Sequence, residues 1–252
     1  MSKQRHVGRV IFGPEWRVIT LHSHAENVTR LAKAWDSERA YLNPRGRNLA
    51  ATHDKLNQAA RIHDVAKPVK FGLWYRENPF HEGEMEWGYT FSGHRFEVFD
   101  DDSYVQTLAR LHHTYATDEV IRAVARLQAD EVPHAANLPF DLYALEMCDQ
   151  IEATLARAAL GGDVETRTFM DFYIETGDSK RFSLDPFPFS AIEIPLTVEY
   201  AVLSPPGKWV WQVETGDKKK RKEALNELRD WVVTALQTAS LENEEVIVCA
   251  LT

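Results

Sequence analysis

The segment Ala59-Ala-Arg-Ile-His-Asp-Val-Ala-Lys-Pro68 is the most informative part of this 252-residue chain for predicting its fold. Residues three, four and seven positions apart share one face of a helix. His63 therefore falls on the apolar face of Leu56, and Asp64 follows it directly. The closing proline ends the helix, because proline lacks a backbone N–H and its ring clashes with the preceding turn. The spacing predicts a helix over residues 53–66 that offers an adjacent His-Asp pair to the protein interior.

Three further predicted helices, over residues 21–35, 103–113 and 142–160, carry polar side chains in register with apolar ones. These inward-facing residues are His24 on the first, His112 and His113 on the second, and Asp149 on the third. A single inward histidine is more simply explained as a hydrogen-bonded core residue. Several buried histidines and carboxylates on four helices would each need a partner, and one metal centre satisfies them together.

The predicted ligand set consists of imidazole and carboxylate groups, without a thiolate. Such ligands suit hard or borderline divalent ions, and Mn, Ni, Co, Fe, Mg and Zn all remain open. One aspartate can bridge two ions, and a two-metal site activates a water as nucleophile and stabilises the leaving oxygen of a phosphoester. The pattern therefore predicts a metal-dependent phosphohydrolase.

The order of these residues is similar to that of a known family. His24, then His63-Asp64, then Asp149 on successive helices resembles the HD superfamily of metal-dependent phosphohydrolases. Further segments resemble the HD nuclease that partners a separate helicase in type I CRISPR interference: Ser23-His24-Ala-Glu-Asn-Val28, Ser92-Gly-His94-Arg-Phe-Glu97, Leu111-His112-His113 and Met147-Cys-Asp149. The resemblance covers about residues 20–155.

The resemblance implies an assignment for each site residue. One ion would be held by His24, His63, Asp64 and Asp149. Asp64 would bridge to a second ion, held by His94, His112 and His113. Catalysis would involve Asp64 and also Lys67, which would face the substrate phosphate, and His81 is a weaker substrate-binding candidate. His94 rests mainly on the resemblance. The family usually has glycine where this chain has Ala66.

The implied activity is cleavage of phosphodiester bonds in single-stranded DNA, with RNA as a second substrate, by a two-metal activated-water mechanism. No G-x-x-x-x-G-K loop is present in the sequence, so the helicase and the CRISPR effector complex would be separate partners. An HD-family nucleotidase or cyclic-nucleotide phosphodiesterase is the alternative. A cyclic-dinucleotide enzyme is disfavoured because His113 is followed by Thr-Tyr-Ala. A non-catalytic scaffold with this fold is the third hypothesis.

The expected architecture is mainly α: an HD helical bundle over residues 1–185 and a small α+β module over residues 186–252. In the module, strands are predicted over residues 192–203 and 209–213, a helix over 218–237 and a last strand over 245–251. Residues 70–93 are predicted to form a long loop with at most one short helix. Its aromatic residues either pack or stack on bases. The basic residues Lys218–Lys222 are interpreted as a solvent-exposed helix face rather than as a binding site for a phosphate backbone.

Composition limits the protein class. The 44% hydrophobic and 27% charged residues are typical of a globular protein, and no segment is apolar enough for a membrane span. The net charge of −9 argues against a protein that coats nucleic acid through bulk electrostatics. Two distant cysteines exclude a zinc finger or a disulfide framework. A cytoplasmic protein is the expectation.

Overall fold

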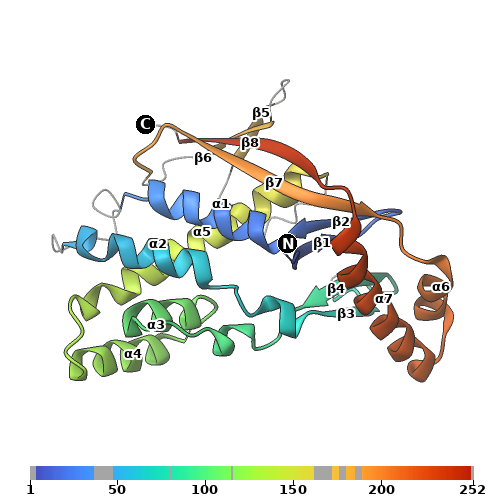
Figure 1. Ribbon diagram of the computed structural model, residues 1–252, viewed down its shortest axis with the longest axis horizontal. Coiled ribbons are helices and arrows are strands. Elements are labelled where there is room, and N and C mark those ends of the chain that lie inside the picture. Colours follow the sequence, from blue (N-terminus) through green and yellow to red (C-terminus); the bar gives the residue numbers. More distant parts are fainter. Residues whose placement is uncertain are drawn as a thin grey trace. The chain divides into compact units, whose positions relative to one another are not determined.

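The computed structural model describes residues 4–36, 48–79, 81–114, 116–161, 172–175, 180–184 and 189–250 (Figure 1). Its contacts divide the chain into two compact units. The first unit comprises Met1–Ser23, Ala66–His94 and Glu199–Asn243, and the second comprises His24–Val65, Arg95–Val198 and Glu244–Thr252. The predicted module over residues 186–252 corresponds to neither unit, because its residues are shared between both. Its predicted boundary at residue 185 lies outside the described residues.

The first unit contains three antiparallel strands in the order β1-β2-β7. Strand β1 (Val7–Ile11) pairs with β2 (Trp16–Thr20), and β2 pairs with the end of β7 (Glu193–Leu203), with Val18 opposite Ala201. Helices α6 (Gly207–Thr215) and α7 (Lys218–Thr238) follow β7. Apolar side chains of these strands and helices form one core together with Phe71 and Phe91: Val7, Val10, Trp16, Val18, Ala201, Leu203, Val213, Ala224, Leu228, Val232 and Leu236.

The predicted loop over residues 70–93 is instead largely a β-hairpin. After the 3-10 turn η2 (Lys67–Lys70), β3 (Gly72–Glu77) pairs with β4 (Met85–Thr90). The register places Tyr75 opposite Trp87, with 5.0 Å between the ring centroids. Trp74 lies over Gly88, where an added Cβ would come within 2.0 Å of the indole. In β4, Trp87 and Tyr89 alternate with Gly88 and Thr90, and aromatic residues with a period of two favour a strand.

The predicted strand over residues 209–213 is wrong, because this segment lies within helix α6. Trp209 and Val213 are four residues apart, so they share a helix face, and Val213 is fully buried. The predicted helix after it is confirmed as α7. Asp217 caps it by accepting hydrogen bonds from the backbone N–H groups of Lys219 and Lys220 at 3.0 and 2.9 Å. This carboxylate offsets the unfavourable lysines of the first turn, which are exposed.

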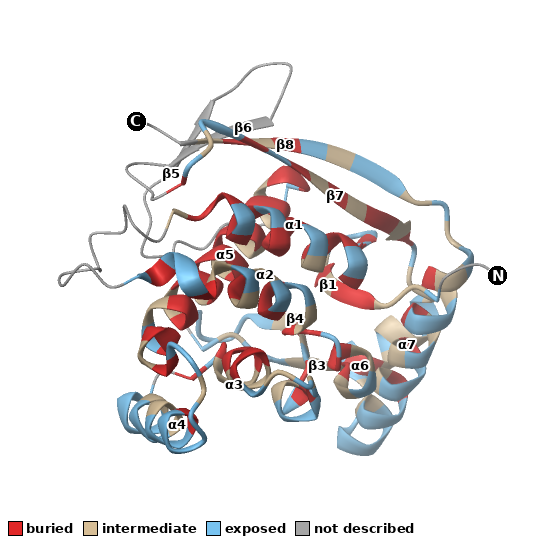
Figure 2. Cartoon of the chain, turned by 60° about the vertical axis from the view of Figure 1, so that its left-hand side comes forward, coloured by how far each residue is buried: buried red, intermediate tan, exposed pale blue. Residues whose placement is uncertain are grey.

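The second unit is mainly helical and contains the rest of the chain. Its helices are most of α1 (Leu21–Ala34), then α2 (His53–Ile62), α3 (Ser103–Leu111), α4 (Thr117–Ala129) and α5 (Leu138–Ala159), with 3-10 turns η1 (Leu49–Thr52), η3 (His94–Glu97) and η4 (Ala135–Asn137). Figure 2 shows buried residues along α5, whereas α4 is largely exposed. Helix α5 is therefore the centre of this unit.

Strands complete the second unit. Strand β5 (Phe172–Glu175) pairs antiparallel with β6 (Lys180–Leu184), and β6 pairs parallel with β8 (Glu242–Ala250). The prediction of a mainly α fold is therefore wrong: both units contain sheet strands, and the described residues form a mixed α/β fold. The β2–β7 and β6–β8 pairings join strands that lie more than 60 residues apart along the chain, so local sequence patterns do not reveal them. Among the described helices, none is both long and apolar enough to cross a membrane.

Candidate metal centre

Two of the predicted histidine ligands lie at helix ends. Helix α2 ends at Ile62 rather than near residue 66, and His63 is its C-cap. Helix α3 ends at Leu111, and His112 is its C-cap. Both caps keep right-handed helical dihedral angles, so the side chains continue the phase of the helix. His63 is 0% exposed and His112 is 1% exposed, in agreement with the predicted inward direction.

The backbone orients both imidazole rings in the same way. Nδ1 of His63 lies 2.8 Å from the carbonyl oxygen of Ala60, and Nδ1 of His112 lies 2.5 Å from that of Ala109. A carbonyl only accepts hydrogen bonds, so each Nδ1 must carry the proton and donate it. In the neutral ring, Nε2 then holds the lone pair that a metal ion needs. The two helix ends therefore present two Nε2 atoms as ligands.

The first group of ligands consists of His24, His63, Asp64 and Asp149, all buried, with their ligand atoms within 4.8 Å of one another. Nε2 of His24 lies 2.9 Å from Oδ2 of Asp64 and 3.2 Å from Oδ1 of Asp149. Nε2 of His63 lies 3.2 Å from the same Asp64 oxygen. Neighbouring ligands about 2.1 Å from one ion are separated by about 3 Å. This group fits a single divalent ion.

Glu152 is a candidate site residue that the sequence prediction missed. It lies one helical turn after Asp149 on α5, is 1% exposed, and its Oε2 lies 2.5 Å from Nδ1 of His24. Asn27 Nδ2 donates to the other Glu152 oxygen at 3.5 Å and to the carbonyl of Thr197 at 2.9 Å. A carboxylate behind a ligand histidine fixes its orientation and raises its basicity. Glu152 lies three residues after Asp149 and so shares its inward helix face. This spacing could have revealed Glu152 in the sequence.

Burial and charge act in opposite directions on the groups of this cluster. Burial alone would lower the pKa of His63, but the carboxylates of Asp64 and Asp149 raise it to about 9. Burial would raise the pKa of Asp149, but hydrogen bonds and charge from His24 and His63 hold it well below its usual value. The pKa of His112 is lowered, mainly by burial. Without a metal ion, the cluster therefore retains a proton on His63 that an ion would displace.

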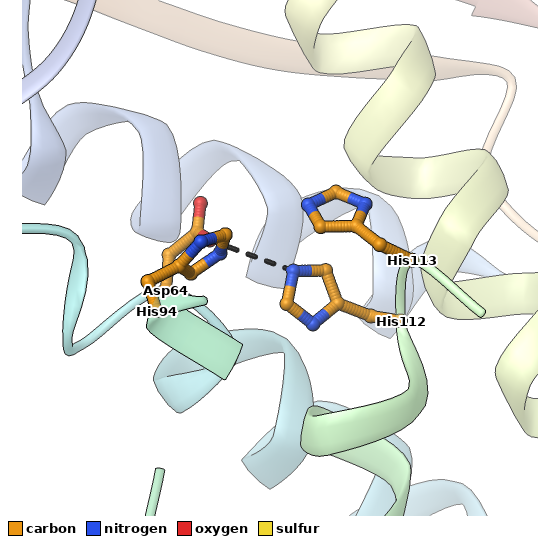
Figure 3. Close-up of side chains that lie close together, drawn as sticks. All are labelled: Asp64, His94, His112 and His113. Carbon is orange, nitrogen blue, oxygen red and sulfur yellow. Dashed lines mark ion pairs between the residues drawn. The ribbon is translucent and has the colours of Figure 1, made fainter. Parts of the chain in front are cut away.

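A second group of ligands shares Asp64 with the first. Asp64, His112 and His113 offer ligand atoms within 4.8 Å of one another. Figure 3 shows His112 facing Asp64, with 3.6 Å between Nε2 and Oδ1, while His113 stands beside it with 4.0 Å between the ring centroids. The Asp64 oxygen Oδ2 faces His24 and His63, whereas Oδ1 faces His112. This carboxylate is therefore arranged as a bridge.

The remaining predicted site residues belong to the first unit. His94, also drawn in Figure 3, is buried, and its Nδ1 lies 2.7 Å from the carbonyl oxygen of Phe91. Its ring is thus oriented as those of the two helix-end histidines are. Lys67 is buried in η2, with Nζ 5.1 Å from the ring centre of Phe91. His81 is exposed in the β3–β4 turn. The roles of these three residues at a metal centre stay predictions.

Replacing Glu152 with glutamine should weaken metal binding about 10- to 100-fold without unfolding the protein, because His24 loses its charged partner but keeps a neighbour of the same size. Isothermal titration with Mn²⁺ measures this change. Asp141→Asn is the matched control, since Asp141 is an equally buried carboxylate on α5 that bonds Tyr104 at 2.6 Å instead. Equal losses of affinity in both variants would contradict the role of Glu152.

Comparison with known proteins adds no family assignment. No protein-family model, no curated protein sequence and no solved structure matches the chain.

Proposed function

We propose that the chain is a metal-dependent nuclease of the HD type that hydrolyses phosphodiester bonds of single-stranded DNA, with RNA as a second substrate. The resemblance of its motifs supports a place in CRISPR interference, in the cytoplasm, beside a separate helicase and an effector complex. The coarser statement, that a buried His/Asp cluster can hold a metal ion, rests on the geometry itself. The more specific assignment as a nuclease rests, in addition, on the order and identity of the predicted ligands along the sequence.

The observation that carries the proposal is the position of Asp64. Its side chain is 1% exposed and has imidazole Nε2 atoms on both sides, at 2.9 Å and 3.2 Å from Oδ2 and 3.6 Å from Oδ1. A structural ion site needs only one ion and a closed set of ligands. A carboxylate with candidate ligands on both sides is instead typical of a hydrolase that binds two metal ions.

Each side chain has a definite task in this proposal. Two divalent ions, when bound, supply Lewis-acid stabilisation of phosphoryl oxygens and lower the pKa of a water molecule. Asp64 would bind both ions and so fix the distance between them. His113 is exposed, unlike the other ligands of the second unit, so the second group is the side that substrate would reach. We assign His94 as the fourth ligand of the second group and Lys67 as a phosphate contact, on the family resemblance.

A panel of substrates tests the proposal. The purified protein is incubated with Mn²⁺ or Ni²⁺ and labelled single-stranded DNA, single-stranded RNA, mononucleotides or a cyclic dinucleotide. Degradation of single-stranded DNA that stops on chelation is the expected result. If nucleotides or the cyclic dinucleotide are hydrolysed and DNA is not, the alternative nucleotidase or phosphodiesterase is correct. A folded, metal-loaded protein that hydrolyses none of these substrates would favour the scaffold hypothesis.

A further inference from the structure

A cavity of about 260 Å³ lies in the second unit, on the surface of helices α3 and α4. Its lining includes Phe96, Arg110, Thr114, Glu119, Arg122 and Arg126. None of these residues belongs to the two groups of metal ligands. Thr114, however, directly follows the ligand pair His112-His113 and is buried. A residue of the cavity lining is therefore the sequence neighbour of a candidate metal ligand.

The cavity is positively charged, although the whole chain carries a net charge of −9. Three arginines line it against one glutamate, Glu119. Arg122 forms a pair with Asp118 at 2.8 Å, but both side chains are well exposed, and such pairs contribute little. Among the described residues no carboxylate pairs with Arg126, which is exposed on the same face one turn later. Guanidinium groups in this arrangement favour phosphate, which they bind through paired hydrogen bonds.

Phe96 of the cavity lining and the nearby Phe99 are exposed aromatic residues, with 62% and 72% of their surface accessible. The guanidinium carbon of Arg95 lies 4.8 Å from the ring centre of Phe96, and that of Arg110 lies 4.9 Å from the ring centre of Phe99. Arg95 also donates to the hydroxyl of Thr114 at 2.7 Å. Arg95 and Arg110 thus stand over the two rings. Arg95 is oriented by its hydrogen bond to Thr114, and Arg110 by one to the carbonyl oxygen of Val98.

We infer that this cavity binds single-stranded nucleic acid, with Arg122 and Arg126 on phosphates and Phe96 stacked on an unpaired base. Alternating aromatic and cationic groups are the chemistry by which proteins bind single strands without reading their sequence. Bases of a duplex are stacked on each other and would not reach Phe96. The assignment deepens the proposed function and rests on it for the identity of the substrate. Thr114, which lines the cavity, directly follows His113 of the second group of metal ligands in the sequence.

Binding without cleavage tests this inference. The full-length protein in EDTA is titrated against a fluorescein-labelled 12-residue oligothymidylate, and fluorescence anisotropy gives the Kd. Phe96→Ala and Arg126→Glu should each raise the Kd by about 10-fold or more. Arg126→Glu should also make the dependence of log Kd on log salt shallower by about 0.7 or more, because a phosphate contact is lost. Lys33→Glu, the same charge reversal at an exposed position on α1, should change neither value.

A second assay separates this inference from the proposed function. Hydrolysis of bis(4-nitrophenyl) phosphate with Mn²⁺ reports on the metal centre alone and should be unchanged in Phe96→Ala and Arg126→Glu. If the wild type hydrolyses neither this ester nor DNA, yet both variants lose oligonucleotide binding, the nuclease proposal fails and the binding site stands. An unchanged Kd in both variants overturns the binding site. Displacement by polyglutamate as effective as that by unlabelled oligothymidylate also overturns it, in favour of an acidic protein partner.

Discussion

Replacing Asp64 with alanine is expected to lower phosphodiester hydrolysis at least about 1000-fold, the largest effect of any single change in this chain. Both groups of ligands share this carboxylate, so its loss opens both at once. The measurement is the initial rate of single-stranded DNA cleavage with saturating Mn²⁺. Metal analysis should show about two ions per chain in the wild type and fewer in the variant.

The chain offers a matched control for this experiment. His53-Asp54 repeats the dipeptide His63-Asp64 at the start of the same helix, but Asp54 is exposed. Asp54→Ala should therefore keep nearly the full rate. Because removal of a buried carboxylate beside histidines can cost several kcal/mol of stability, Asp64→Asn provides a variant of nearly unchanged shape. A wild-type rate in Asp64→Ala would rule out the assigned centre. One ion per chain in the wild type would remove His94, His112 and His113 from the ligand set.

The stability of the metal-free protein is expected to fall as the pH rises from about 6.5 through 9. The pKa of His63 is raised from 6.5 to about 9 in the folded state, so the proton on its ring stabilises the fold. That stability is complete below the unfolded pKa of 6.5 and is lost as the pH passes the folded value. Linkage gives a loss of the order of 3 kcal/mol in the free energy of unfolding. Urea denaturation at several pH values measures it.

Metal loading should reverse this trend. An ion can bind His63 only after its proton leaves, so metal affinity rises with pH over the same range. At a free concentration 100 times its Kd, an ion adds about 2.7 kcal/mol to the stability. At a fixed free ion concentration, the difference in Tm between loaded and metal-free protein should therefore grow from pH 6.5 to 9. His63→Asn should remove the slope, whereas His22→Ala, at an exposed position on α1, should keep it. A metal-free protein with flat stability over this range would argue against the protonated cluster.

Helix phase was a sound guide to the candidate ligands, because it depends on residues only three to seven positions apart. The inward directions of His24, His63 and Asp149 follow from this local rule, and all three side chains are buried. The ends of the helices were less accurate. His63 lies at the end of α2 rather than inside it, where a backbone carbonyl orients its ring. That hydrogen bond depends on where the helix stops, which helix phase does not predict.

Local sequence patterns place polar residues of metal-ligand types on inward helix faces of the second unit and predict α7 and β7. The packing of the helices is needed to show that each oxygen of Asp64 faces histidines of a different ligand group and that Glu152 stands behind His24. These contacts join residues that are far apart along the chain. Helix phase is local, whereas a carboxylate on α5 meets a histidine on α1 128 residues away only when the helices pack.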